Sequence, residues 1–223
     1  MNKLFLTFTL CLTWNVFSQS SNNIAKVPQD FIPSGHLITE SIRGDLNNDG
    51  LEDYVFITKG TLNSKFVKDE MRGLLDRNRR GIVIVLNKGN KYELAFESRD
   101  CFSSENEDGG VYFPPFLNVS IEKGNLLIHY AHGRYGYWRY NFKYQNSGFI
   151  LIGYDREEAS GPVLLRSVSI NLITKKMLIK ENTNPNYRPE KFKSKWSDFI
   201  LKKPLKLNDF VDFDACQAIL LEC

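Results

Sequence analysis

One stretch of this chain specifies a strand–loop–strand unit: Asp45-Leu46-Asn47-Asn48-Asp49-Gly50-Leu51-Glu52-Asp53. Side-chain oxygens fall at loop positions 1, 3, 5 and 9, and a backbone carbonyl, that of Leu51, falls at position 7. Gly50 permits the sharp turn that directs these groups to one point. Hard oxygen donors at this spacing suit Ca²⁺ better than Zn²⁺ or copper. We therefore predict a Ca²⁺ site formed by Asp45, Asn47, Asp49, Leu51 and Asp53.

The residues on both sides of this loop are typical of strands. Residues 53–58 after it are mostly aromatic or β-branched, and residues 36–42 before it form a second segment of the same kind. Position 12 of the loop is Phe56, where a helical EF-hand has a bidentate Glu. The loop therefore joins two strands and not two helices.

The segment from Gly44 to Tyr54 resembles the calcium loops of FG-GAP and VCBS repeats, which occur in integrin-α propellers and in many secreted bacterial proteins. The resemblance covers only this small part of the chain. It implies a metal and a strand–loop–strand unit, and it implies no activity. The alternative is a hairpin rich in Asn, Asp and Gly that binds no metal.

Residues 1–18 have the pattern of a signal peptide. Lys3 supplies a positive charge, and residues 4–17 are largely apolar but too few to span a bilayer. Small residues at Val16 and Ser18 fit cleavage after Ser18. We therefore expect a periplasmic or secreted protein whose residues 19–223 form a single β-rich calcium-binding domain, with no later membrane span.

Charge and cysteine content restrict the partners and the redox state. The formal net charge of +3 is nearly balanced and gives no support for a nucleic-acid groove. Removal of the signal peptide leaves three cysteines, Cys101, Cys216 and Cys223. An odd number in an oxidising compartment leaves one thiol unpaired or intermolecular. The spacing leaves open which two would pair.

Short apolar or alternating runs separated by turn residues recur through the chain. They predict a mainly β fold, an antiparallel meander of about ten strands that is propeller-like or a sandwich, with one or two short helices. Hairpins are expected at 81–96, 117–130 and 137–154. Only residues 64–78 have apolar residues at helical spacing, and residues 207–221 are expected to contain a short helix or two.

A second unusual segment, residues 129–140, is dense in aromatic and basic side chains. Tyr, Trp and Arg are the residues that dominate binding hot spots. We therefore predict partner binding through His132, Arg134, Tyr135, Tyr137 and Trp138. The alternative is a hairpin whose aromatic residues pack the core.

The third segment, residues 100–110, contains Glu105, Glu107 and Asp108. Three interpretations remain open: an acidic surface loop, a cation contact, or a carboxylate pair of the kind that hydrolyses glycosides.

These features favour an exported, non-enzymatic, calcium-stabilised binding protein. A β-rich body with one such loop is similar to periplasmic lysozyme-inhibitor and immunity proteins that carry a calcium loop. That similarity implies an inhibitor or immunity role with a cell-wall hydrolase as the protein partner; a glycan is the other partner class considered. The alternative function is a secreted polysaccharide or peptidoglycan hydrolase with a structural calcium.

Overall fold

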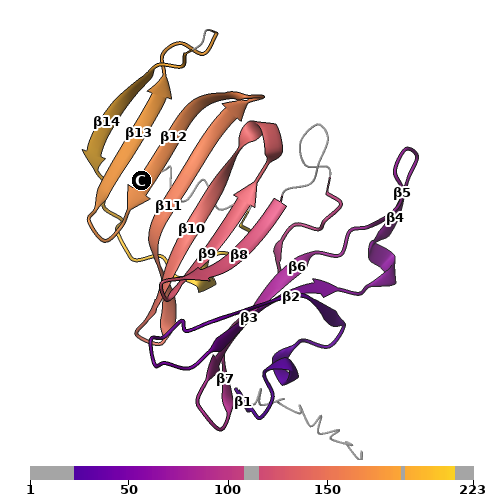
Figure 1. Cartoon of the computed structure of the whole chain (residues 1–223). Helices are drawn as coiled ribbons and strands as arrows, with labels where there is room; N and C mark the ends of the chain where they lie inside the picture. The colour runs from indigo at the N-terminus through magenta and orange to yellow at the C-terminus, as the bar shows by residue number, and fades with distance from the viewer. Residues whose placement is uncertain (1–22, 108–115, 187–188, 214–223) are drawn as a thin grey trace, which may run out of the picture.

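The protein is built almost entirely from antiparallel strands (Figure 1). The computed structural model describes residues 23–107, 116–186 and 189–213. The predicted mainly β fold is confirmed, with fourteen strands in these described ranges where about ten were expected. The strands are β1 (Ile24–Ala25), β2 (His36–Gly44), β3 (Asp53–Gly60), β4 (Phe66–Asp69), β5 (Gly73–Asp76), β6 (Arg80–Asn87), β7 (Tyr92–Phe102), β8 (Phe116–Glu122), β9 (Asn125–Ala131), β10 (Gly136–Gln145), β11 (Gly148–Ser160), β12 (Val163–Asn171), β13 (Lys176–Asn182) and β14 (Phe192–Asp198).

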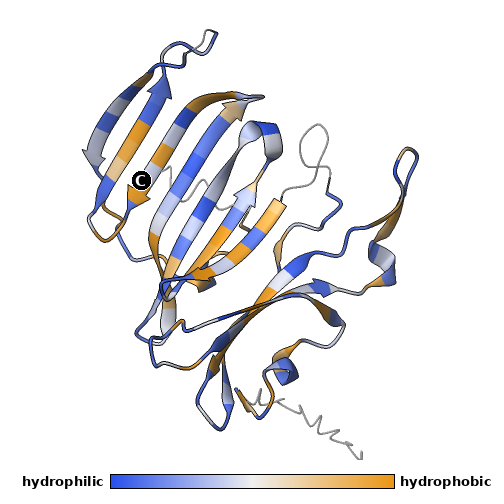
Figure 2. Ribbon diagram, in the orientation of Figure 1, coloured by the Kyte–Doolittle hydropathy of each residue, from blue (hydrophilic) through white to orange (hydrophobic). Residues whose placement is uncertain are grey.

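Strands β8 to β14 form a seven-stranded sheet in which every strand pairs with its neighbour in sequence. Tight turns make this possible, and positive φ angles at Lys123, Gly124, Asn146 and Lys175 lie at or beside three of them. Hydrophilic and hydrophobic residues alternate along these strands (Figure 2). The alternation places one face of the sheet on the core and the other, here called the outer face, toward solvent.

A second sheet has five strands in the order β1-β7-β6-β3-β2. Strand β6 lies in its centre and is buried from Arg80 to Leu86. Ile82 and Ile84 contact the main core, whereas Val83 and Val85 pack against Phe31 on the opposite face. Burial on both faces explains why residues 81–87 read as a continuous apolar run.

The two sheets share one hydrophobic core. Val55 and Ile84 of the five-stranded sheet belong to the same buried cluster as Ile128 and Phe142 of the seven-stranded sheet. The chain after β14 completes this cluster with the side chains Phe199, Leu205, Leu207, Phe210 and Phe213. The sequence left a propeller-like arrangement or a sandwich open; a core between two sheets is the sandwich type of packing.

The helical prediction for residues 64–78 is wrong. Most of this segment forms the hairpin of β4 and β5, which projects from the body (Figure 1). Gly73 has φ +81°, which ends the turn between the two strands, and Val67 pairs with Leu75. The helical segments in the described ranges are short 3₁₀ turns: η1 (Pro28–Phe31), η2 (Asn63–Lys65), η3 (Gly133–Tyr135) and η4 (Leu207–Asp209).

Three expectations about the ends of the chain involve residues outside those described. They are the signal peptide at 1–18, the C-terminal helix beyond residue 213, and the state of Cys216 and Cys223. Cys101 is buried and free, and the question of which cysteines pair lies with Cys216 and Cys223 outside the described residues. Within the described ranges, no helix has the length and apolar character needed to cross a membrane.

Candidate functional site

The 45–53 loop connects β2 to β3 in a tight left-handed path. Asn48 has φ +59° and Gly50 has φ +85°. A Cβ on Gly50 would meet no atom within 4 Å, so glycine is needed there for its backbone angle and not for space. Asn is among the few other residues that adopt such angles readily. The sequence thus determines the shape of the loop locally.

Side-chain oxygens of the loop are turned toward its own backbone amides. Asp45 accepts from Asp49 N–H through Oδ1 at 3.2 Å and from Gly50 N–H through Oδ2 at 2.9 Å. Asn47 Oδ1 accepts from Asp49 N–H at 3.0 Å, and Asp49 Oδ1 accepts from Leu51 N–H at 2.9 Å. Asn47 Nδ2 donates to Asp49 Oδ2 at 2.9 Å. These bonds gather the oxygens predicted for positions 1, 3 and 5.

Asp53 links this loop to the rest of the sheet. Its side chain is fully buried. Oδ2 accepts from Leu46 N–H at 2.8 Å, and Oδ1 accepts from Asn87 N–H at 2.9 Å at the end of β6. Sequence reasoning assigned Asp53 only as a ligand, because the contact with Asn87 joins residues distant in the chain. Each carboxylate oxygen retains a lone pair beyond the one that accepts the amide.

The electrostatics of the loop leave negative charge uncompensated. Burial raises the pKa of the Asp53 carboxyl, the amides of Asn87 and Leu46 partly offset this, and the charges of Asp49 and Asp45 raise the pKa further. Among the described residues, no Lys, Arg or His forms an ion pair with any of these three carboxylates. The charges of Asp45 and Asp49 therefore act on Asp53 with no cationic side chain of the described ranges paired to any of the three.

The donor set fits a hard cation and not a soft one. Over the described ranges, no group of three or more His, Cys, Asp or Glu side chains is already arranged to hold a metal ion. Ligation at this loop would instead combine the carboxylates with the amide oxygen of Asn47 and the carbonyl of Leu51. Carboxylate, amide and carbonyl oxygens are the ligands that Ca²⁺ takes, whereas a Zn²⁺ site would use His or Cys.

The loop also contacts the seven-stranded sheet. Leu46 is fully buried in the shared core. A Cβ on Gly44 would lie 2.8 Å from Cγ2 of Ile121 in β8, and a Cβ on Gly124 would lie 2.8 Å from Oδ1 of Asn48. Both glycines thus allow a close approach between the loop and the β8–β9 hairpin. A change in the conformation of the loop would therefore alter the contacts at the junction of the two sheets.

The predicted partner-binding residues are divided between different surfaces. His132 and Trp138 stack with ring centroids 3.8 Å apart, and Trp138 also stacks on buried Tyr130, so both belong to the side of the sheet that faces the core. Tyr137 points to the outer face, because successive residues of a strand alternate. Arg134 and Tyr135 lie in η3, where Tyr135 is half exposed. The structure therefore brings together only parts of the predicted set.

On the outer face, polar side chains from four strands line a hollow. Arg139 Nη2 donates to Asp155 Oδ2 at 2.8 Å, and Ser169 Oγ donates to Asp155 Oδ1 at 2.7 Å. The hollow beside them measures about 240 Å³ and is lined by Tyr137, Asp155, Arg156, Glu157, Ser167, Val168, Ser169, Leu178 and Lys180. Burial raises the pKa of Tyr137, as do the nearby charges of Glu157 and Asp155. Sequence reasoning found only Tyr137 here, because strand register brings the others together.

Edge strand β14 extends the same face. Trp196 is 67% exposed, and it pairs with Leu178, which pairs with Ser169. A large exposed aromatic ring beside a polar hollow can stack on a flat apolar surface while the polar groups bond to the same partner. The outer face is therefore suited to recognition of a partner with both kinds of surface.

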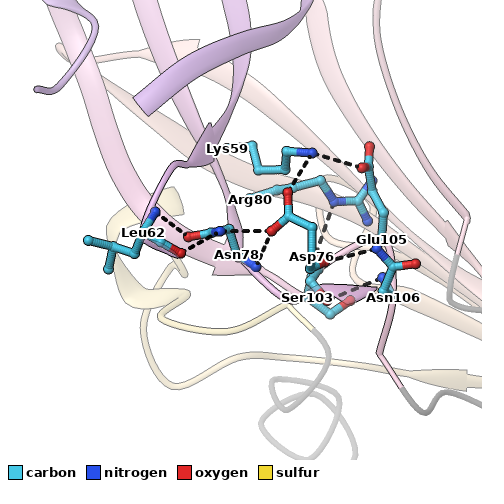
Figure 3. A network of polar contacts seen from close by, with 9 residues as sticks. Lys59, Leu62, Asp76, Asn78, Arg80, Ser103, Glu105 and Asn106 are labelled. Atoms are coloured by element: carbon cyan, nitrogen blue, oxygen red, sulfur yellow. Dashed lines mark hydrogen bonds and ion pairs between the residues drawn. The ribbon is translucent and has the colours of Figure 1, made fainter. Parts of the chain in front are cut away.

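The described part of the acidic segment, residues 100–107, takes part in a structural network (Figure 3). Lys59 Nζ lies 3.2 Å from both Asp76 Oδ2 and Glu105 Oε2. Asn106 Nδ2 donates to the carbonyl of Asp76 at 2.9 Å. Although burial lowers the pKa of Lys59, its bonds to the two carboxylates raise the pKa overall. Asp76 and Glu105 are thus held against a lysine that ties β3 to the connections after β5 and β7.

Glu107 is also engaged, with Oε1 accepting from Ser104 N–H at 3.2 Å, and Asp108 lies outside the described residues. The interpretation of this segment as a pair of catalytic carboxylates gains no support from these bonds.

Comparison of the chain with family models, curated proteins and solved structures finds no match.

Proposed function

We propose that this protein is an exported, non-enzymatic binding protein stabilised by a calcium ion in the β2–β3 loop. The observation that carries the calcium proposal is that the charges of Asp45 and Asp49 act on buried Asp53 while none of the three carboxylates forms an ion pair with a cationic side chain among the described residues. Burial raises the pKa of Asp53 most, and a divalent cation would offset the further rise that the charges of Asp49 and Asp45 cause. Bonds from Asp53 to Leu46 and Asn87 would then carry the effect into β6.

The ion's role in this proposal is to join the two sheets. The loop contacts β8 through Gly44 and the β8–β9 turn through Asn48. With the ion bound, the loop would hold the two sheets together around Leu46. An ion that binds only the folded chain stabilises it by RT ln(1 + [L]/Kd), about 2.7 kcal/mol at a hundredfold excess over Kd.

For the partner, we propose a cell-wall hydrolase that contacts Arg134, Tyr135 and Tyr137. Support comes from the exposure of Arg134 and Tyr135 in η3 and from the outer-face position of Tyr137. Tyr and Arg are enriched among the residues that dominate protein interfaces. The other two predicted residues, His132 and Trp138, support the surface from the core side.

The calcium proposal is tested by thermal melting of residues 19–223 in Ca²⁺, in Mg²⁺ and in chelator. We expect Ca²⁺ to raise the melting temperature by about 5–11 °C at a hundredfold excess, since 1 kcal/mol corresponds to roughly 2–4 °C at this size. Asp49→Ala should lose the rise. Glu52→Ala is the matched control, because it removes a carboxylate from the same loop at an exposed position outside the predicted ligand set.

Equal melting in Ca²⁺ and chelator for the parent chain would refute the calcium proposal.

The partner proposal is tested separately by the rate at which a muramidase clears a peptidoglycan suspension. We expect the parent chain to slow clearance and Tyr135→Ala to slow it less. An unchanged clearance rate with the parent chain in excess would refute an inhibitory role toward that enzyme.

A further inference from the structure

A pocket lies at the end of the seven-stranded sheet where β11 begins. It is formed by β10, by the start of β11, by the β12–β13 turn and by the chain after β14. Backbone bonds hold these pieces together. Leu151 N–H donates to Leu205 O at 2.8 Å, Phe199 N–H donates to Lys175 O at 2.9 Å, and Leu172 N–H donates to Ile152 O at 2.9 Å. These backbone hydrogen bonds therefore fix the positions of the segments that line the pocket.

The pocket has the size and lining of a small-molecule site. Its volume is about 540 Å³, within the range of about 300–1,000 Å³ usual for ligand pockets. Nine of its twelve lining residues are apolar: Ile150, Leu151, Ile152, Leu172, Ile173, Phe199, Ile200, Leu201 and Pro204. Ile173 is 67% exposed and Ile200 is 66% exposed. Large aliphatic side chains gain free energy when a ligand covers them.

The polar part of the lining is positive. Among the described residues it consists of Lys143, Lys175 and Gln145, with no Asp or Glu. Within the described part of the chain, neither lysine forms an ion pair. A ligand that matches this lining has an apolar body and an anionic head.

We propose that this pocket binds a small amphiphilic anion, such as a medium-chain alkyl carboxylate or phosphate. The alkyl chain lies against Ile152, Ile173 and Ile200, and the head group pairs with Lys143 and Lys175. This site is separate from the calcium loop and from the outer-face hollow: its residues belong to neither. The proposal does not depend on the proposed function.

Titration calorimetry with three ten-carbon amphiphiles tests the proposal, each used below its micelle concentration. The probes are decanoate, decyl phosphate and decyltrimethylammonium, which share a chain and differ in the head group. We expect at least one anion to bind tenfold or more tightly than the cation. Equal binding of all three, or binding of none, would overturn the proposal.

Two variants separate the roles of head and tail. Lys143→Glu with Lys175→Glu should weaken anion binding by at least tenfold and remove the preference over the cation. Lys193→Glu with Lys195→Glu is the matched control, since both lysines are exposed on β14 and line no part of this pocket. Ile200→Asp should abolish anion binding without unfolding the chain, because this side chain is exposed. Anion binding that survives Ile200→Asp would place the ligand elsewhere and refute the assignment.

Discussion

A single methyl group added at Gly44 should destabilise the junction between the two sheets. Gly44 lies at the end of β2, directly before Asp45. A Cβ added there would lie 2.8 Å from Cγ2, 3.1 Å from Cβ and 3.3 Å from Cδ1 of Ile121. Favourable carbon–carbon contacts lie at about 3.5–4.0 Å. Because the backbone of Gly44 is not in the left-handed region, the cost of Gly44→Ala is steric and not conformational.

Overpacking of this kind costs about 1–3 kcal/mol. The free energy of unfolding of Gly44→Ala should fall by that amount, which corresponds to a loss of roughly 2–12 °C in melting temperature at this chain length. Urea unfolding gives the free energy directly. Gly148→Ala is the matched control, because a Cβ there meets nothing within 4 Å and its φ is not positive. Its effect should stay within about 0.5 kcal/mol.

The double variant Gly44→Ala with Ile121→Ala tests the reason for the cost. Ile121→Ala removes two of the three contacting atoms, Cγ2 and Cδ1, and leaves only Cβ, so Gly44→Ala should cost less than about 0.5 kcal/mol in that background. A coupling energy near 1–3 kcal/mol would then assign the effect to this contact. If Gly44→Ala were neutral, or equally costly with and without Ile121, the reasoning about the sheet junction would be refuted.

Three further predictions concern single residues. In chelator, the pKa of Asp53 is raised, so its contribution to stability is present at pH values below its ordinary pKa of 3.8 and is lost as the pH rises through the raised pKa. Urea midpoints of the parent and of Asp53→Asn, measured against pH, should differ in this way, and parallel curves would contradict the prediction. Burial raises the pKa of the Cys101 thiol to about 12, so in a chain with Cys216→Ser and Cys223→Ser a thiol reagent should react only after unfolding, whereas rapid reaction of the native chain would count against it. Leu46→Ala should cost about 2–5 kcal/mol in urea unfolding because this side chain is fully buried, whereas the exposed Leu51→Ala should cost under about 0.5 kcal/mol, and equal costs would exclude a core role for Leu46.

Local signals in the sequence were sufficient for the β class and for several turns. Lys123-Gly124 and Asn146-Ser147 have positive φ, so their residue types predicted the hairpins around them. The same local information misled for residues 64–78. Apolar residues at 66, 71, 74 and 75 fit a helix, but Met71 and Leu74 are 95% and 70% exposed, so the spacing marks no buried stripe. A short hairpin and a helical turn are hard to distinguish from so few positions.

Contacts distant in the chain account for what the sequence did not predict at the candidate site. The loop shape follows from Asn48 and Gly50, but Asp53 is held by the backbone amide of Asn87, which is distant in the chain. Strand alternation predicts that Tyr137 and Trp138 face opposite sides. It does not say which side is the core, since that depends on the five-stranded sheet. The outer-face hollow requires the register of β10 to β13, which no local pattern specifies.

The order in which this chain can fold follows from the position of its last described residues. The seven-stranded meander pairs only neighbours in sequence, so its hairpins can form early and locally. Phe210 and Phe213 then complete a core begun far upstream, and Phe213 N–H donates to Cys101 O at 3.0 Å. Closing such a long loop is slow, because its entropy is lost before the contact is gained. We therefore expect a chain that lacks residues 199–213 to remain loosely packed, with the core between the two sheets incomplete.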